Sequence, residues 1–349
     1  MARPDSPTTG PVTQRMGTGK QPVSVTLTGL RCLVEIAEAN LNISAAGQAM
    51  HLSQSCVSRH LKQIEDSLGY RIFARNGRSL VDVTPAGRMA LDVARRVVRD
   101  VEGLCDLAAN TRGETAGELA IAAPQTYALH VLPPLLRRLR ERYPDLSVRM
   151  HTLGDDQRMR VSEHDRFDTV IVSSTGDGVP DGTAVPLFRW RRVALVERSH
   201  PLASHSGTIP LAELARWPLV THEAARQPDS TLNRTMAMHG LTPRFACSAP
   251  DAATIKAYAR AGLGVGLVAE LSLDPADYSR FAVLALDAAL PDSIAWAILP
   301  RGRVLRNAAL ELVRLLAPDL DADTLRRASQ GQPPAHWPTP PYHHRTPEA

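Results

Sequence analysis

The sequence predicts an α/β protein with an N-terminal all-α winged helix-turn-helix, followed by a two-lobed α/β domain. Three observations predict this fold class. Apolar residues at helical spacing precede a hairpin pattern in residues 25–84, a long amphipathic helix covers residues 85–113, and strands alternate with helices from residue 117 onward. The 349 residues are enough for two folded domains.

The two ends of the chain differ in composition from the rest. Residues 1–24 are rich in Pro, Thr, Gly and Ser, and residues 329–349 contain repeated prolines. Such segments bury too little apolar surface to offset the entropy cost of ordering. We therefore expect a disordered extension at residues 1–24 and a disordered tail at residues 329–349. Met16 offers an alternative start.

A helix-turn-helix is predicted at residues 43–68. Ser53 follows the turn and is a good N-cap, because its hydroxyl can accept a hydrogen bond from an unpaired amide. The second helix buries four side chains at spacings of four, three and four: Val57, Leu61, Ile64 and Leu68. The other side of this helix is polar and basic, with Ser53, Gln54, Ser55, Ser58, Arg59 and Lys62.

This polar face suits contact with double-stranded DNA. The first turns of a recognition helix reach base edges in the major groove. Gln54 and Arg59 suit bidentate contacts to adenine and guanine, and Ser55 and Ser58 are small enough to allow close approach. The alternative is an ordinary two-helix corner with a solvated polar face.

A wing is predicted directly after the second helix. Residues 70–75 and 79–83 are typical of two short strands, and Asn76-Gly77 between them is a strong hairpin signal. Arg71, Arg75 and Arg78 put positive charge on this hairpin. Contacts from such residues to phosphates add salt-dependent affinity without sequence information. The alternative for these arginines is ordinary solvated surface.

A long helix begins at Thr84-Pro85, because threonine is an N-cap and proline is favoured in the first helical turn. It has one continuous apolar line: Ala90, Val93, Val97, Val101, Leu104 and Ala108. We expect this linker helix, residues 85–113, to pair with a second copy as a coiled coil. A dimer would present two recognition helices to successive major grooves. The alternative is packing onto the chain's own second domain.

The second domain is expected at residues 117–317. Strands at residues 118–123, 146–150 and 169–172 alternate with helices, which predicts a parallel sheet covered on both faces. A strand at residues 193–196 opens a second lobe, and the chain returns to the first lobe near Ser293. Lobe I is expected at about 117–190 and 291–317, and lobe II at about 191–290. Two lobes joined by two crossovers resemble a periplasmic binding protein.

Several local motifs resemble the LysR-type transcriptional regulators. They are Ser53-Gln54 with Val57-Ser58-Arg59, then Ile72-Phe73-Ala74-Arg75, and Val83-Thr84-Pro85-Ala86-Gly87. Within that family the chain is most similar to the CysB/Cbl subgroup, on segments such as Glu141-Arg142-Tyr143-Pro144 and Gly240-Leu241-Thr242-Pro243-Arg244. The resemblance covers about residues 25–328. It implies a DNA-binding regulator with a two-lobed effector domain, and the subgroup controls sulfur assimilation and cysteine synthesis.

A ligand of an open α/β sheet lies beyond the carboxyl ends of strands, where helix N-termini present amides. Three loops at such ends contain polar side chains, which are the candidate effector-binding residues: Gln125, Thr126, Tyr127, Ser173, Ser174, Thr221 and His222. Hydroxyls together with helix amides suit a small anion. Simple capping of each loop by Ser and Thr is the alternative.

The resemblance implies acetylserine-type inducers or anions such as sulfate as effectors. Thr126 matches a threonine of the subgroup, and Ser173 replaces a threonine conservatively. Pro124 stands where a threonine is expected and Tyr127 where a glutamine is expected. Tyr127 and His222 could therefore admit a larger ligand, whose carboxylate Arg226 could meet. A LysR-type regulator of an unrelated pathway with a larger ligand is thus the alternative.

The sequence gives little support for an enzyme or for a metal site. The glycines of residues 262–266 lack the dinucleotide-binding spacing, and no Walker A motif or nucleophile elbow is present. The four cysteines have no metal-ligand spacing. We expect no enzyme, no metal and no cofactor, with a small-molecule-binding protein or an enzyme as remote alternatives.

The composition is compatible with a regulator that acts on DNA. A formal charge of +4 and a pI near 9.0 are only modestly basic, so the signal for DNA is local. No secretory signal and no membrane-spanning run is recognised, which favours the cytoplasm and no membrane contact. The expected partners are double-stranded DNA, a small-molecule effector, RNA polymerase, and further copies in a homodimer or homotetramer.

Overall fold

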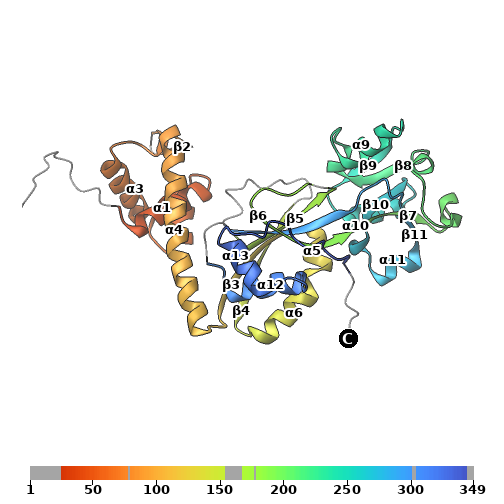
Figure 1. The fold of residues 1–349 in the computed structure, drawn as a ribbon. Helices are drawn as coiled ribbons and strands as arrows, with labels where there is room; N and C mark the ends of the chain where they lie inside the picture. Colours follow the sequence, from red (N-terminus) through yellow and green to blue (C-terminus); the bar gives the residue numbers. More distant parts are fainter. Residues whose placement is uncertain (1–24, 78, 154–166, 177, 301–303, 344–349) are drawn as a thin grey trace, which may run out of the picture. The chain divides into compact units, whose positions relative to one another are not determined.

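The structure is a computed structural model that describes residues 25–343, apart from residues 78, 154–166, 177 and 301–303 (Figure 1). The chain divides into two compact units, residues 1–101 and residues 102–349. The expected extension at residues 1–24 and Arg78 of the wing lie outside the described residues.

The first unit is a three-helix core with a hairpin. Its helices are α1 (Leu27–Glu38), α2 (Ile43–Ala49) and α3 (Gln54–Leu68), each begun by a side-chain cap from Thr26, Asn42 or Ser53. Gly69 ends α3 at φ 78°, a conformation that favours glycine. The antiparallel strands β1 (Phe73–Asn76) and β2 (Ser79–Val83) follow. The winged helix-turn-helix predicted from the sequence is thereby confirmed.

The core of this unit contains side chains from every one of these helices. Cys32, Leu33 and Ile36 of α1 meet Val57, Leu61 and Ile64 of α3, together with Ile72 and Phe73 at the start of the hairpin. Each fully buried side chain of this size stabilises the fold by about 1.5–3 kcal/mol through removal of apolar surface from water. Burial raises the pKa of the Cys32 thiol to about 11, so this thiol stays protonated at neutral pH.

The first turn of α4 (Pro85–Arg112) packs closely on the hairpin. Thr84 Oγ1 donates to the Arg71 carbonyl at 2.8 Å and accepts from the Gly87 amide at 2.9 Å. A Cβ at Gly87 would lie 2.0 Å from the Ile72 carbonyl oxygen, so no larger residue fits without displacement of the backbone. The Thr-Pro-Ala-Gly motif therefore serves as a helix cap and as a close contact between α4 and the wing.

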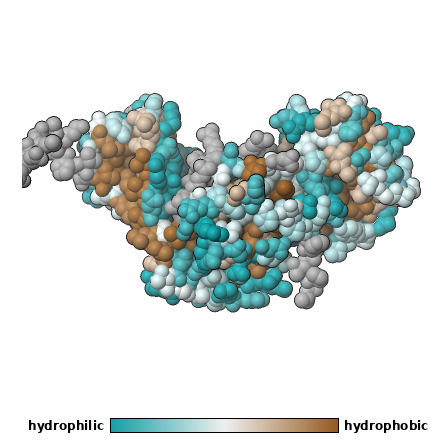
Figure 2. Space-filling view, viewed as in Figure 1, coloured by the Kyte–Doolittle hydropathy of each residue, from teal (hydrophilic) through white to brown (hydrophobic). Residues whose placement is uncertain are grey.

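The long helix α4 exposes large apolar side chains. Leu91 and Ala94 are buried, whereas Met89, Val93, Val97, Leu104 and Leu107 are exposed to solvent. Three of the exposed residues belong to the apolar line that the sequence predicts. Figure 2 shows hydrophobic surface gathered where Figure 1 draws the first unit and α4.

The second unit contains two five-stranded sheets. Lobe I has the strand order β4-β3-β5-β12-β6, and lobe II has the order β11-β7-β10-β8-β9. The strands of lobe I are β3 (Gly117–Pro124), β4 (Leu146–Leu153), β5 (Thr169–Thr175), β6 (Thr183–Trp190) and β12 (Ser293–Leu299). Those of lobe II are β7 (Arg192–Glu197), β8 (Pro218–His222), β9 (Arg244–Ala249), β10 (Val265–Ala269) and β11 (Phe281–Ala285).

The prediction of a parallel sheet is wrong in part, because both sheets contain parallel and antiparallel pairs. β3 pairs in parallel with β4 and β5, but β12 runs antiparallel to β5 and β6. In lobe II, β8 pairs in parallel with β9 and β10, while β7 runs antiparallel to β10 and β11. The antiparallel pairs arise because the chain leaves lobe I along β6 and enters it again along β12.

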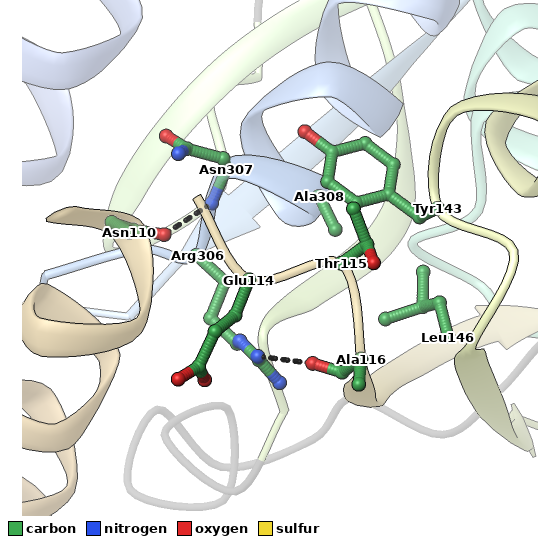
Figure 3. Close-up of a pocket in the computed structure, with 9 residues that line it drawn as sticks. All are labelled: Asn110, Glu114, Thr115, Ala116, Tyr143, Leu146, Arg306, Asn307 and Ala308. Carbon is green, nitrogen blue, oxygen red and sulfur yellow. Dashed lines mark hydrogen bonds between the residues drawn. The ribbon is translucent and has the colours of Figure 1, made fainter. Parts of the chain in front are cut away.

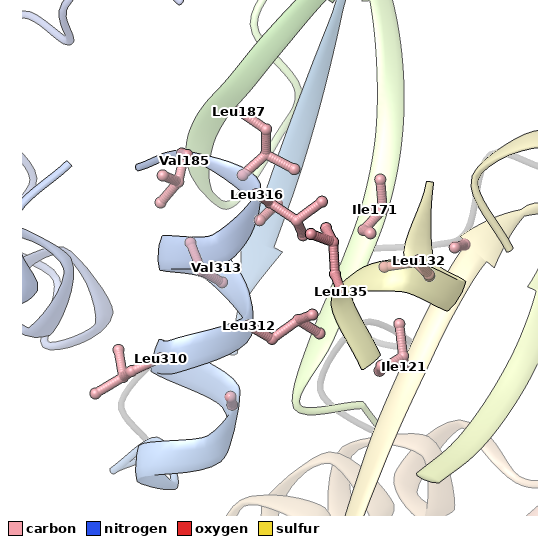
Figure 4. Close-up of a cluster of buried hydrophobic side chains, with 14 of the residues drawn as sticks. Ile121, Leu132, Leu135, Ile171, Val185, Leu187, Leu310, Leu312, Val313 and Leu316 are labelled. Atoms are coloured by element: carbon pink, nitrogen blue, oxygen red, sulfur yellow. The ribbon is translucent and has the colours of Figure 1, made fainter. Parts of the chain in front are cut away.

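Helices cover the sheets of both lobes. Lobe I has α5 (Gln125–His130), α6 (Leu132–Arg142), α12 (Asn307–Leu316) and α13 (Ala322–Ser329). Lobe II has α8 (Leu211–Leu214), α9 (Thr231–Met238), α10 (Ala252–Arg260) and α11 (Pro275–Arg280), with short helices η1 (Pro201–Ser204), η2 (Glu223–Arg226) and η3 (Glu270–Ser272). Figure 4 shows α6 and α12 meeting through Leu135, Leu312 and Leu316 beside Ile121 and Ile171 of the sheet.

Two crossovers join the lobes. Arg191 is the one residue between β6 and β7, and residues 286–292 connect β11 to β12. The lobes also contact each other at η3 of lobe II, whose Leu271 is buried in the core of lobe I. His130 Nδ1 of α5 also lies 3.3 Å from Asp274 Oδ1 of lobe II. The two-lobed architecture predicted from the sequence is confirmed.

The segment after residue 317 differs from the expectation. Residues 322–329 form α13, which the sequence analysis missed, and Leu325 is fully buried in the core of lobe I. Residues 329–349 were expected to be a disordered tail. Within it, Ser329 ends α13, Trp337 packs against the lobe I core, and a bridge joins Tyr342 to Arg189.

A small polar cavity of about 10 Å³ lies where the end of α4 meets lobe I (Figure 3). Asn110 Oδ1 accepts from the Asn307 amide at 2.9 Å and so caps α12, while its Nδ2 donates to the Leu305 carbonyl. Arg306 donates to the Ala116 carbonyl at 2.7 Å. A space of this size holds about one water molecule, so we interpret it as part of a structural joint.

Within the part of the chain that the structure describes, no helix combines the length and apolar character needed to span a membrane.

Candidate nucleic-acid interface and effector site

The polar face of α3 is open to solvent in the first unit. Gln54, Ser55, Arg59 and Lys62 are exposed and Ser58 is half-buried, while Val57 and Leu61 on the opposite face are fully buried. The predicted candidate residues therefore lie on one accessible side of one helix. Side chains with this placement can reach base edges and phosphates.

The start of α3 is held by hydroxyl groups. Ser53 Oγ accepts from the Cys56 amide at 3.2 Å and lies 3.0 Å from Ser55 Oγ. Arg59 Nη2 lies 3.6 Å from Cys56 Sγ, a weak contact that leaves the guanidinium exposed. These contacts fix the first turn of the helix while leaving its charged groups available.

Glu65 connects α3 to the wing. Its carboxylate is buried and accepts hydrogen bonds from the amides of Ile72 and Phe73 at 2.9 and 3.3 Å. It also forms ion pairs with Arg71 at 3.0 Å and Arg75 at 3.2 Å. A buried carboxylate with four donors is well compensated. The sequence analysis missed this role, although a buried acid on the apolar side of a predicted helix was the available signal.

The ion pair with Glu65 limits how Arg75 can contact DNA. Its side chain is 35% exposed and one guanidinium nitrogen is engaged by Glu65, whereas the Arg71 side chain is 63% exposed. Arg75 can reach a phosphate only with its remaining donors. Both arginines still place positive charge beside α3.

In lobe I, the predicted effector residues lie at the carboxyl ends of β3 and β5. Gln125, Thr126 and Tyr127 form the first turn of α5, and Ser173 and Ser174 lie near the end of β5. Tyr127 and Ser173 are brought together, with their hydroxyl oxygens 2.5 Å apart. The two loops therefore do meet at one edge of the sheet, as the sequence predicts.

Two tryptophans complete this edge. Trp190 Nε1 donates to the Tyr127 hydroxyl at 2.8 Å, and Trp296 Nε1 donates to Ser174 Oγ at 2.7 Å. The Tyr127 ring is buried in the core of lobe I beside Phe188, with the ring centroids 6.0 Å apart. Tyr127 thus offers a ligand its hydroxyl and not an open ring face. No local sequence pattern pointed to either tryptophan.

In lobe II, Thr221 and His222 are the last two residues of β8, which pairs in parallel with β10. They therefore also lie at the carboxyl end of a parallel strand. Thr221 is buried and His222 is half-buried. Arg226 of the following η2 helix is exposed, lies 3.4 Å from Ser248 Oγ and covers the Phe245 ring at 5.9 Å. These groups belong to the second sheet, so a ligand that contacts both sets must lie between the lobes.

Arg192 is a further candidate that the sequence analysis missed. It is the first residue of β7, directly after the first crossover, and pairs in register with Ala269 at the end of β10. Its Nη1 atom is buried and has no hydrogen-bond partner among the described residues. Burial lowers the pKa of this guanidinium because it disfavours the charged form. An arginine directly before the apolar run of a predicted strand was the available signal.

The arrangement at Arg192 is costly unless an acceptor is supplied. A buried donor that loses its water without gaining a partner destabilises the fold, and the cost is larger when the group is charged. A bound oxyanion would provide charge and acceptor oxygens to a guanidinium fork. Among the described residues, no group of three or more His, Cys, Asp or Glu side chains could hold a metal ion.

Two family models match the chain. Residues 27–88 match the bacterial regulatory helix-turn-helix protein of the lysR family. Residues 112–321 match the LysR substrate binding domain. The two matches fall on the winged helix-turn-helix and on the two lobes.

Relatives and solved structures agree with these models. The HTH-type transcriptional regulator cbl of Klebsiella aerogenes is 32% identical over 299 residues, covering 85% of this chain and 94% of the relative. The regulator CysB of Burkholderia cenocepacia is 29% identical over 302 residues, covering 86% and 96%. A full-length OxyR variant from Pseudomonas aeruginosa has a TM-score of 0.65 at 22% identity, covers 86% of this chain and 99% of its own, and is alike in fold.

Proposed function

Because this chain belongs to the LysR family of bacterial transcriptional regulators, we propose that it reads promoter DNA through α3 and the wing, under the control of a small anionic metabolite bound between its two lobes. The family membership rests on both matched models and on relatives that align over most of the chain. The particular residues and the class of effector are the substance of the proposal.

For DNA, Gln54 and Arg59 contact base edges, and Ser53, Ser55, Ser58 and Lys62 fit the groove and its phosphates. The support is their common position on the accessible side of α3. Arg75 and Arg78 of the wing contact phosphates, with Arg75 also held by Glu65. Base contacts set sequence preference, whereas phosphate contacts set affinity and its salt dependence.

For the effector, the observation that carries the proposal is the buried Arg192 nitrogen that has no hydrogen-bond partner among the described residues. Hydroxyl, amide and imidazole groups from both lobes complete the site: Gln125, Thr126, Tyr127, Ser173, Ser174, Thr221 and His222. An oxyanion between the lobes would satisfy Arg192 and accept from these donors. An anion that prefers one arrangement of the lobes would shift the equilibrium toward that arrangement.

The proposed pathway is sulfur assimilation or cysteine metabolism, and the proposed effector is a sulfur-linked anion. Both proposals rest on the similarity of this chain to Cbl and CysB. Pro124 and Tyr127 depart from the subgroup pattern, so the second candidate is a LysR-type regulator of another pathway with a different, larger ligand. No cofactor beyond this effector and no enzymatic activity are part of the proposal. The chain acts in the cytoplasm, as a homodimer or homotetramer that contacts RNA polymerase.

Isothermal titration of the full-length protein tests the effector class. The panel contains sulfate, thiosulfate, acetylserine, a neutral amino acid and a cationic amine, each added to wild type and to Arg192→Gln. We expect heat with at least one anion and an affinity that falls at least about tenfold in the variant, since a charge-assisted bond contributes about 1.5–3 kcal/mol. Heat only with the neutral or cationic compounds would contradict the proposal.

The thermal midpoint of Arg192→Gln, measured without effector, distinguishes a ligand-binding arginine from a structural one. If Arg192 serves a ligand, its removal relieves an uncompensated buried charge, and the thermal midpoint without effector stays level or rises. A purely structural arginine would instead lower the midpoint when it is removed. Arg198→Gln, an exposed arginine of lobe II, serves as the matched variant that should leave anion affinity unchanged.

A further inference from the structure

The C-terminal segment 331–343, here called the strap, crosses lobe I and ends at the hinge between the lobes. Trp337 packs against the lobe I core. The Arg189 amide donates to the Pro341 carbonyl at 2.7 Å, and the His343 amide donates to the Arg189 carbonyl at 2.8 Å. Arg189 Nε also donates to the Pro340 carbonyl at 2.8 Å. The strap therefore adds a short parallel bridge to β6, the edge strand of the sheet.

Tyr342 reaches both crossovers. Two guanidinium groups contact its ring, with the Arg189 and Arg191 Cζ atoms 4.3 and 4.2 Å from the ring centroid. Its hydroxyl donates to the carboxylate of Asp292. Arg191 is the whole of the first crossover and Asp292 is the last residue of the second. Their side chains also approach each other, with Arg191 Nε 3.9 Å from Asp292 Oδ1.

This position makes the contact sensitive to lobe motion. Closure of two-lobed proteins is absorbed by a few residues in the connecting segments, which change their backbone angles. Arg191 and Asp292 belong to those segments, so a rotation of lobe II against lobe I changes the separation of the groups that hold Tyr342. One arrangement of the lobes keeps both cation–π contacts and the hydroxyl bond, and another arrangement loses some of them.

We propose that the strap is a conformational latch, in which Tyr342 ties Arg191 and Asp292 together and stabilises one arrangement of the two lobes. A ligand that prefers the other arrangement must release the latch, and by reciprocity release of the latch changes the affinity for that ligand. The latch goes beyond the proposed effector, because it acts on the hinge whatever molecule binds between the lobes.

The composition of the strap fits this role. Five of its residues are prolines: Pro333, Pro334, Pro338, Pro340 and Pro341. Proline lowers the conformational entropy of the free segment, so less is lost when the strap is ordered on lobe I. Prolines also lack an amide hydrogen, which prevents the strap from forming a longer strand along β6. The result is a short attachment that can release.

Spin-label distance measurements on the full-length chain test the latch. Labels are placed at Arg138 of α6 and Met238 of α9, which are exposed residues of lobes I and II, after the four cysteines are replaced by alanine. Labelled chain is mixed with excess unlabelled chain, so that only distances within one chain contribute. We expect one narrow distance distribution for the wild-type strap, and a broadened or displaced one for Tyr342→Ala and for Asp292→Asn.

Two further variants separate a latch from a simple cover of β6. Tyr278→Ala removes an exposed tyrosine of lobe II away from the hinge and should leave the distribution unchanged. A chain that ends after Gln332 lacks all but the first two residues of the strap and should match or exceed the change seen in Tyr342→Ala. The latch is ruled out if the truncated chain and Tyr342→Ala both retain the wild-type distribution. It is also ruled out if Tyr278→Ala alters the distribution equally.

Discussion

Glu65 illustrates at the scale of one residue how the wing is positioned. Its carboxylate lies on the buried side of α3 and holds two hairpin amides as well as Arg71 and Arg75. The orientation of the wing arginines relative to α3 thus depends on one acid. Sequence reasoning identified the polar side of α3 correctly because side-chain periodicity is local. It missed the partners of Glu65, since they come from a different element.

Glu65→Ala should destabilise the first unit by about 3 kcal/mol or more, because it leaves buried amides and charges without their acceptor. All four tryptophans, Trp190, Trp217, Trp296 and Trp337, lie in the second unit. Urea unfolding followed by far-ultraviolet circular dichroism should therefore show an early transition, while tryptophan fluorescence keeps its wild-type midpoint. Coincident shifts by both probes would contradict the independence of the two units.

Arg59→Ala tests the assignment of base contact. If Arg59 is bidentate to a guanine, its loss should weaken binding to the operator by about 1–3 kcal/mol and relax the preference at one base pair. Fluorescence anisotropy with operator and with scrambled DNA measures both effects. Lys62→Ala, a matched phosphate contact on the same helix, should weaken both DNAs alike and reduce the salt slope by about one unit. Equal losses on both DNAs for Arg59→Ala would defeat the assignment.

At the scale of elements, the sequence predicts best where periodicity and caps agree. The bounds of α3 and the hairpin follow from Ser53, Asn76 and Gly77. β6 was missed because Pro186 interrupts an otherwise apolar run, and proline weakens a strand prediction. The structure places β6 at the sheet edge, where a missing amide is tolerated. The prolines after residue 330 predicted disorder for the same local reason, although Arg189 donates hydrogen bonds to the carbonyls of Pro340 and Pro341.

The exposed line on α4 supports the expected pairing of this helix with a second copy. Val97 and Leu104 are 39% and 66% exposed within one chain. Replacement of both by glutamate should place charge in the apolar seam and convert the dimer to a monomer at micromolar concentration. Light scattering coupled to size-exclusion chromatography measures the mass. Arg96→Glu, at an exposed position off the line, should remain a dimer.

Two results would overturn this account of α4. A double glutamate variant that keeps the wild-type mass would show that the apolar line is not the interface. A wild-type chain that is monomeric at the same concentration would show that the exposed side chains have no partner of their own kind.

At the scale of the whole molecule, the sequence predicted the order of the domains and the return of the chain to lobe I. Alternating strands and helices contain that information. The sequence could not predict which polar groups already have partners inside the fold. The Tyr127 hydroxyl contacts Ser173 and Trp190, whereas one buried nitrogen of Arg192 lacks a partner among the described residues. Whether a polar group finds a hydrogen-bond partner depends on contacts between segments that are distant in sequence, and local patterns do not encode those contacts.

Affinity selection of fragmented genomic DNA on the purified full-length protein, followed by sequencing, shows whether α3 reads specific sequences in promoter DNA. We expect a small set of promoter fragments with a shared interrupted palindrome for the wild-type protein, and loss of that enrichment for Arg59→Ala. Promoters of sulfur uptake or cysteine synthesis would support the proposed pathway, and other promoters would redirect the search for the effector. Recovery of random fragments by the wild-type protein, or the same enriched set with Arg59→Ala, would contradict the account.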